Sequence, residues 1–173
     1  MGEPLLQVKD LKVSFQVNKN LLTAVDGVDF TLEEGRVLGI VGESGCGKSV
    51  TATSIMRLVP PSVSIIDPKS QILFRGEDLT KASVARMRQV RGSEISMIFQ
   101  EPMSSLNPVY RIGDQMIEMI RAHDKKISKT DALARCVEML SRVGIPSPEQ
   151  RVKEYPHQLS GGMRQRVMIA MAL

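Results

Sequence analysis

The stretch VLGIVGESGCGKSV, residues 37–50, decides the fold expected for this chain. Four positions match the phosphate-loop pattern G-x-x-x-x-G-K-[ST], namely Gly42, Gly47, Lys48 and Ser49. The apolar run before it, residues 37–41, is typical of a buried strand, and residues 50–58 after it can form a helix. The sequence therefore predicts a strand, a phosphate-binding loop and a helix in direct succession.

The residue types of the loop suit a phosphate ligand. Glycine adopts backbone angles that are closed to other residues, and successive N–H groups can then point into one concavity. A helix starting near Lys48 adds a partial positive charge, while Lys48 can reach terminal phosphates and the Ser49 hydroxyl can ligate magnesium. The alternative is a glycine-rich turn without a ligand. The residues expected at the ligand are Gly42, Glu43, Ser44, Gly45, Cys46, Gly47, Lys48, Ser49 and Val50.

The composition is that of a soluble globular protein. The chain has 173 residues, 42% hydrophobic and 24% charged, which is enough for one domain with a core. The net charge of +4 is carried by scattered basic residues, and with four Phe, two Tyr and no Trp we expect no nucleic-acid partner. Cys46 and Cys136 form neither a metal-binding spacing nor a disulfide framework. We expect no signal peptide in residues 1–10, which contain charges and no long apolar core, and no apolar run is long enough to span a bilayer.

The patterns along the chain change from mixed to helical. Strands are expected near residues 5–16, 23–32, 71–74 and 94–99, turns at 18–20 and 76–78, an irregular loop at 62–70, and a weakly amphipathic helix within 79–90. The first later helix has an apolar face of Ile112, Met116, Ile117 and Ile120. The second is capped by Ser128 and buries Leu133, Cys136, Val137, Leu140 and Val143, with Gly144 just past its end. A last helix begins near Gly162.

A second motif, LSGGMRQR at residues 159–166, identifies the class of nucleotide-binding protein. Ser160 and the N–H groups of Gly161 and Gly162 can hold a phosphate at a helix N-terminus, or Ser160 can serve as an ordinary helix cap. Here the chain resembles the ATP-binding-cassette (ABC) ATPases, whose second hallmark is an LSGGQ-type segment. Gln100 matches the family's Q-loop, and Phe15 lies where the family places an aromatic that stacks on adenine. For Phe15, a plain strand-core residue is the alternative.

Three segments narrow the resemblance. VGESGCGKSVTA, SMIFQEPMSSLNP and YPHQLSGGMRQRVMIAMAL look like the ATPases of dipeptide and oligopeptide importers, a branch that includes nickel and glutathione importers. The resemblance implies an α/β fold: a P-loop NTPase core of ABC type with an antiparallel β portion and an inserted α-helical subdomain. Within one incomplete ATP-binding domain, 1–173, we expect a nucleotide-binding α/β portion (1–105), a helical subdomain (106–158) and the signature motif with its helix (159–173).

The resemblance also implies a function and partners. The cofactors would be ATP and Mg²⁺, with Lys48 and Gln100 catalytic and Ser49 and Gln100 at the metal. ATP would be sandwiched between the phosphate loop of one subunit and residues 160–162 of a second ATPase subunit, identical or paralogous. Transmembrane permease subunits would be direct partners and an extracellular or periplasmic peptide-binding protein an indirect one. The protein would be peripheral, on the cytoplasmic face of the inner membrane.

The family's remaining catalytic residues follow the signature helix, and the sequence stops at Leu173. They include a magnesium-binding Asp, a catalytic Glu and a switch histidine. Asp114 and Asp131 fall in the helical portion and His157 precedes the signature, so none of them is expected to substitute. We therefore expect the C-terminal part of the core to be missing, with exposed apolar sheet edges and negligible turnover. A nucleotide-binding module without hydrolysis and a soluble, non-transport ABC ATPase are the alternatives.

Overall fold

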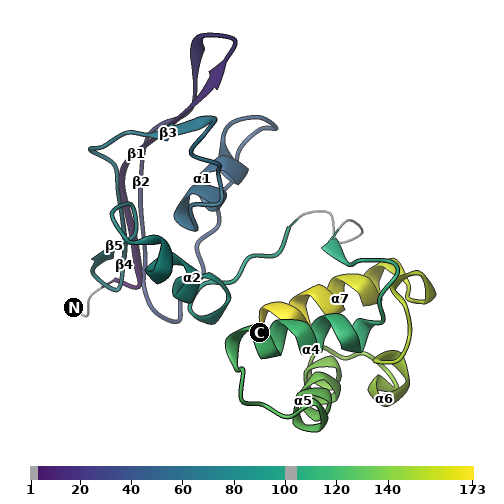
Figure 1. Cartoon of the computed structure of the whole chain (residues 1–173). Helices are drawn as coiled ribbons and strands as arrows, with labels where there is room; N and C mark the ends of the chain where they lie inside the picture. Colours follow the sequence, from purple (N-terminus) through teal and green to yellow (C-terminus); the bar gives the residue numbers. More distant parts are fainter. Residues whose placement is uncertain (1–3, 100–104) are drawn as a thin grey trace. The chain divides into compact units, whose positions relative to one another are not determined.

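The computed structural model describes residues 4–99 and 105–173. The chain divides into two compact units, Met1–Arg91 and Gly92–Leu173 (Figure 1). The predicted divisions at residues 105 and 158 stay predictions. Among the described residues, no helix combines the length and the apolar character needed to cross a bilayer.

The first unit contains an antiparallel sheet. Its strands are β1 (Leu6–Val17), β2 (Asn20–Leu32), β3 (Ser64–Ile66), β4 (Gln71–Phe74) and β5 (Glu77–Asp78). The strand order is β2-β1-β4-β5, with β3 also pairing with β1, and each of these pairings is antiparallel. Asn18 and Lys19 make the predicted β1–β2 turn, with φ of 47° and 71°. The antiparallel β portion is thus confirmed.

The buried side chains of the sheet support helix α1 (Lys48–Ile55), which packs against β1 and β2. Val8, Leu11 and Val13 of β1 are almost fully buried, because apolar residues on one face of a strand are removed from water together. Helix α2 (Val84–Ser93) buries Met87 and Val90. It begins later than the predicted segment 79–90 and extends past it.

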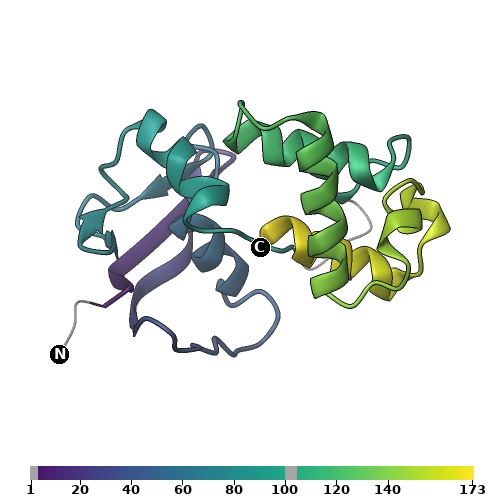
Figure 2. The same cartoon turned by 90° about the horizontal axis from the view of Figure 1, so that it is seen from below.

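The strand predicted at residues 37–41 is not formed. Val37 is 98% exposed and Val41 91%, and the segment runs as a plain tube into the phosphate loop (Figure 2). A strand needs a neighbour to take its backbone hydrogen bonds, and no described residue pairs with this segment. The strand predicted at 94–99 is wrong too: Ile95 forms an isolated bridge, residues 96–99 form no strand, and Ile98 and Phe99 are exposed.

Two short elements also differ from the prediction. Residues 62–70 contain β3 rather than only irregular loop, because β3 pairs with the distant β1. The turn before β5 is made by Arg75 and Gly76, with φ of 47° and 81°. Glu77 and Asp78, predicted as part of that turn, form β5 against β4.

The second unit is helical. Its elements are α4 (Ile112–His123), α5 (Lys129–Arg142), α6 (Pro148–Arg151), the 3₁₀ helix η1 (Pro156–Gln158) and α7 (Gly161–Ala172). Helix α7 contacts both α4 and α5, as Figure 1 shows. These helices enclose a core that includes Ile112, Met116, Cys136, Leu140 and Val167.

The predicted helix faces are largely confirmed. Ser128 caps α5, accepting a hydrogen bond from Asp131 N, and Gly144 follows the helix with φ 74°. Leu133 is 38% exposed, contrary to the prediction, and Ala132 and Met139 are buried in its place. The buried face of α5 is therefore rotated slightly, because α5 packs against α4, α6 and α7 rather than against one neighbour.

Candidate functional site

The N-terminus of α1 is open to a ligand. The helix begins at Lys48, and its N-cap, Gly47, has φ 89° and makes no side-chain cap hydrogen bond. No acidic residue lies in the first turn. The N–H groups of residues 48–50 have no carbonyl one turn earlier within the helix. Together with the helix dipole, these free donors make the turn a site for an anion.

Packing and backbone conformation both require glycine at position 47. A Cβ there would lie 2.4 Å from the Ala24 carbonyl oxygen of β2, which is too close for any real side chain. The positive φ adds a strain that only glycine avoids. At Gly42, a Cβ would lie 2.6 Å from Cys46 Sγ. The loop therefore folds tightly against itself and against β2.

The Lys48 ammonium group lies back over the loop. Its Nζ donates to the carbonyl oxygens of Gly42, at 2.7 Å, and Glu43, at 2.5 Å, and lies 3.5 Å from Cys46 Sγ. Among the described residues, no carboxylate lies within ion-pair distance of this ammonium. The positive charge is therefore matched only by neutral acceptors, which phosphate oxygens can replace with a stronger, charge-assisted bond.

The hydroxyl groups beside Lys48 differ in whether they already donate a hydrogen bond within the protein. Ser49 is exposed, and no hydrogen bond of its hydroxyl to a described residue is found. Thr51 Oγ1 donates to the Gly47 carbonyl, and Ser54 Oγ to the Val50 carbonyl. The exposed Glu43, Ser44 and Gly45 complete the loop, and Val50 is half-buried within α1. In residues 4–99 and 105–173, no three His, Cys, Asp or Glu side chains gather to hold a metal. Among the described residues, the Ser49 hydroxyl would be the protein's ligand for a magnesium ion here, beside the bound nucleotide's own oxygens.

The N-terminus of α7 has a different arrangement. Ser160 is its N-cap, and Ser160 Oγ accepts a hydrogen bond of 3.3 Å from Met163 N. Gly161 and Gly162 are exposed, and a Cβ on either would meet nothing within 4 Å. The start of α7 is thus a capped helix end facing solvent, with room for another group to approach. Both interpretations of Ser160 stay open in this geometry.

The other predicted residues are placed as follows. Phe15 is half-buried on β1, opposite Leu22 of β2 and Ser64 of β3, which fits either an adenine-stacking or a core role. Gln100 lies outside the described residues. The exposed His157 ring stacks on Tyr155 with centroids 5.6 Å apart. Asp131 is used by the Ser128 cap of α5.

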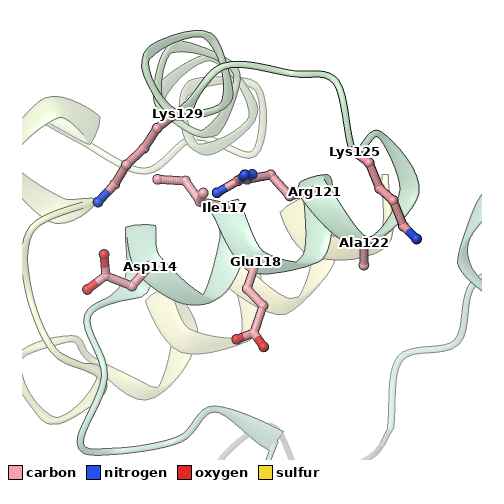
Figure 3. Close-up of a pocket in the computed structure, with 7 residues that line it drawn as sticks. All are labelled: Asp114, Ile117, Glu118, Arg121, Ala122, Lys125 and Lys129. Atoms are coloured by element: carbon pink, nitrogen blue, oxygen red, sulfur yellow. The ribbon is translucent and has the colours of Figure 1, made fainter.

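A hollow of about 680 Å³ lies in the helical unit, along α4 and the start of α5. Acidic and basic side chains both line it, including Asp114, Glu118, Arg121 and Lys129. Figure 3 shows that their charged groups point in different directions rather than toward one centre. Because no group of one charge converges there, α1 carries the stronger case for a ligand site.

The sequence matches one family along most of its length. The profile of the family described as "ABC transporter" matches residues 25–173. The oligopeptide transport ATP-binding protein OppD of Bacillus subtilis is 53% identical over 169 residues, covering 98% of this chain and 47% of that protein. The dipeptide transport ATP-binding protein DppD of the same organism is 53% identical over 172 residues, covering 99% and 50%. The chain thus spans about half the length of these curated relatives.

Solved structures agree on the fold. The structure titled "Dimeric Structure of MJ0796, a Bacterial ABC Transporter Cassette" aligns with a TM-score of 0.80 at 23% identity, covering 97% of this chain and 68% of that one. A post-hydrolysis state of the same cassette, titled as bound to ADP and Pi, aligns with a TM-score of 0.78 at 22% identity and the same coverage. At this level of identity the likeness confirms the fold class alone.

Proposed function

This chain belongs to the ABC transporter family, and we propose that it carries the nucleotide-binding part of an ATPase that powers uptake of short peptides. The observation that carries the proposal is the open N-terminus of α1, with Lys48 over a glycine loop and no carboxylate beside it. The sequence identity of 53% with the oligopeptide and dipeptide transport ATP-binding proteins supports peptides as the proposed cargo. Nickel or glutathione uptake is the alternative cargo within the same proposal.

In this proposal the phosphate loop binds the phosphates of ATP. The N–H groups at the start of α1 donate to phosphate oxygens, and Lys48 exchanges its two carbonyl acceptors for phosphate oxygens. Ser49 presents its hydroxyl to Mg²⁺, and Phe15 presents its ring to adenine. Bound MgATP supplies the phosphoanhydride whose cleavage resets the transporter. Gln100, outside the described residues, is proposed as the contact to the metal or the attacking water.

The start of α7 is proposed to act on a second subunit. Ser160, Gly161 and Gly162 would hold the γ-phosphate of ATP bound to the opposite ATPase subunit, and their exposure leaves them accessible to it. The dimeric state of a related cassette supports this arrangement. Permease subunits in the inner membrane, contacted from its cytoplasmic face, and an extracellular or periplasmic binding protein complete the proposed system.

A second candidate function is nucleotide binding without hydrolysis by the chain on its own. Its support is that no described acidic side chain contacts Lys48 or Ser49, so a general base and a second metal ligand are lacking in the described part. We expect negligible ATP turnover by the 173-residue chain. Steady hydrolysis that disappears in Lys48→Ala would decide against this candidate.

Titration with a fluorescent ATP analogue and Mg²⁺ tests the proposed site. Lys48→Ala is expected to weaken binding by about 100-fold, since it removes a charge-assisted contact to the phosphates. Lys69→Ala is the matched control, because Lys69 is exposed in a loop of the same unit and its side chain makes no described contact. Equal affinity of the wild type and Lys48→Ala would contradict the assignment.

A further inference from the structure

Few side chains of helix α1 are fully buried. Within residues 48–55, only Thr51 and Ser54 are buried, and each donates its hydroxyl hydrogen bond to a carbonyl of the same helix or its cap. The segment before the phosphate loop, residues 37–41, pairs with no described strand. The helix packs against β1 and β2, and Met56 at its C-cap is buried, but no strand directly before the phosphate loop helps to hold it.

The opposite end of α1 is held by two arginines that reach across to a second segment. Arg91 of α2 donates from Nε to the Met56 carbonyl, at 2.8 Å, and from Nη2 to the Arg57 carbonyl, at 2.6 Å. Arg57, in turn, donates from Nη1 to the carbonyls of Leu79 and Ala82, at 3.2 and 2.5 Å. We call Arg57 and Arg91 the arginine clamp. Its four hydrogen bonds join the end of α1 to α2 and the turn before it.

Charge and backbone geometry strengthen the clamp. The C-terminal end of a helix carries a partial negative charge and carbonyls without helical partners, which a guanidinium satisfies. Arg57 follows the C-cap with φ 48°, the left-handed conformation of a helix ending that Leu58 N closes by donating to the Thr53 carbonyl, so its side chain leaves the helix at a fixed point. Both arginines are half-buried, so their hydrogen bonds compete less with water than surface bonds do.

We propose that Arg57 and Arg91 are positioning residues for the phosphate loop. The inference rests on the proposed function, because it assigns the clamp a role in nucleotide binding. A helix of eight residues is a rigid rod of about 12 Å, so fixing its C-terminal end also fixes the donors at its N-terminus. The clamp thereby adds polar contacts at one end of α1 to the packing of the helix against β1 and β2. Neither arginine touches the phosphate loop, so neither is a catalytic residue.

Arg91→Gln tests the clamp, with Arg88→Gln as its matched control. Arg88 lies one turn earlier on α2, is exposed and makes no described side-chain contact. A hollow of about 460 Å³ borders both clamp arginines. Glutamine at position 91 is shorter than arginine, so it fits without overlap. Arg91→Lys keeps a charge that can reach one of the two carbonyls. Each variant is measured by titration with the fluorescent ATP analogue and by the amide NMR signals of Gly45, Gly47 and Lys48 without nucleotide.

The proposal predicts about tenfold weaker binding in Arg91→Gln, partial recovery in Arg91→Lys and wild-type affinity in Arg88→Gln. The loop amide signals should move in Arg91→Gln and stay unchanged in Arg88→Gln. Unmoved signals and unchanged affinity in a folded Arg91→Gln would overturn the clamp. If Arg91→Gln does not fold, unmoved loop signals in a folded Arg91→Lys would overturn it equally. A wild type that fails to bind nucleotide overturns the proposed function instead, while the amide signals still decide the positioning.

Discussion

The chain contains two helix starts that its sequence marks for phosphate, and they are built differently. At α1 the N-cap is Gly47, whose lack of a side chain leaves the first-turn N–H groups unoccupied. At α7 the N-cap is Ser160, whose hydroxyl already accepts from Met163 N. Only α1 also has a lysine over its loop. The first-turn donors and the cation at α1 are thus free for the ligand that we propose there, whereas the Ser160 cap at α7 already satisfies one donor of its own helix.

The two starts also differ in why they contain glycine. Gly47 cannot carry a Cβ because of the Ala24 carbonyl and its own φ, whereas Gly161 and Gly162 face open space. Glycine at α1 is therefore required by the fold. At α7 the packing of the described residues does not require glycine.

Replacing a glycine at each helix start should give the largest difference in stability between the two sites. Gly47→Ala is expected to lower the free energy of unfolding by about 3 kcal/mol, through the left-handed φ and the overlap with Ala24 O. Gly162→Ala should change it by no more than about 0.5 kcal/mol, since its Cβ meets nothing. Urea unfolding measures both. Equal losses in the two variants would show that the two loops are constrained alike.

Thiol labelling distinguishes the two units, because each contains one cysteine. Cys46 is exposed in the phosphate loop, whereas Cys136 is fully buried in the helical core. Burial raises the pKa of the Cys136 thiol to about 11, so at pH 8 this thiol is almost entirely protonated and unreactive. A thiol-specific reagent should therefore modify Cys46 quickly and Cys136 only on unfolding, with Cys46→Ser as the control.

MgATP should slow the labelling of Cys46 and leave Cys136 unaffected, because only Cys46 lies in the proposed site.

The raised pKa of the Cys136 thiol also makes stability depend on pH. Between pH 9 and about 11, the unfolded chain loses the Cys136 proton while the folded chain keeps it, so stability should fall as the pH rises through this range. Rapid labelling of Cys136 in the folded chain would contradict the buried core of the helical unit.

The smallest expected effects concern the two serine caps. Ser128 Oγ accepts from Asp131 N at 3.0 Å and donates to Asp131 Oδ2 at 2.7 Å, so Ser128→Ala should cost about 1 kcal/mol. The Ser160 cap is longer, at 3.3 Å, and has no reciprocal bond, so Ser160→Ala should cost about 0.5 kcal/mol. The difference in urea midpoint measures this ranking. A larger loss for Ser160→Ala would assign Ser160 mainly to helix stability.

Local signals predicted the parts of the molecule that short-range chemistry determines. The phosphate-loop pattern located the start of α1, and Ser128 with Asp131 located the start of α5. The turn at Asn18 and Lys19 was likewise confirmed. In each case a cap, a turn residue or a glycine acts within a few residues of itself, so the sequence nearby contains the whole cause.

Some elements that depend on pairing between distant segments were not predicted correctly. Residues 37–41 have the composition of a buried strand, but a strand forms only against a neighbour, and none is described. Ser64–Ile66 forms β3 because it pairs with β1. A segment of three residues with a proline on either side gives no sign of that distant partner. The contacts of Arg57 and Arg91 also join residues far apart in the chain. No motif marked either arginine in advance.

The most direct test of the central claim is an amide NMR titration of the 173-residue chain with MgATP. A nucleotide site at the open start of α1 predicts saturable shifts for Gly45, Gly47, Lys48 and Ser49. Gly161 and Gly162, at the capped start of α7, should not shift at concentrations where the chain is monomeric. Unmoved signals at residues 45–49, or equal shifts at both helix starts, would contradict it.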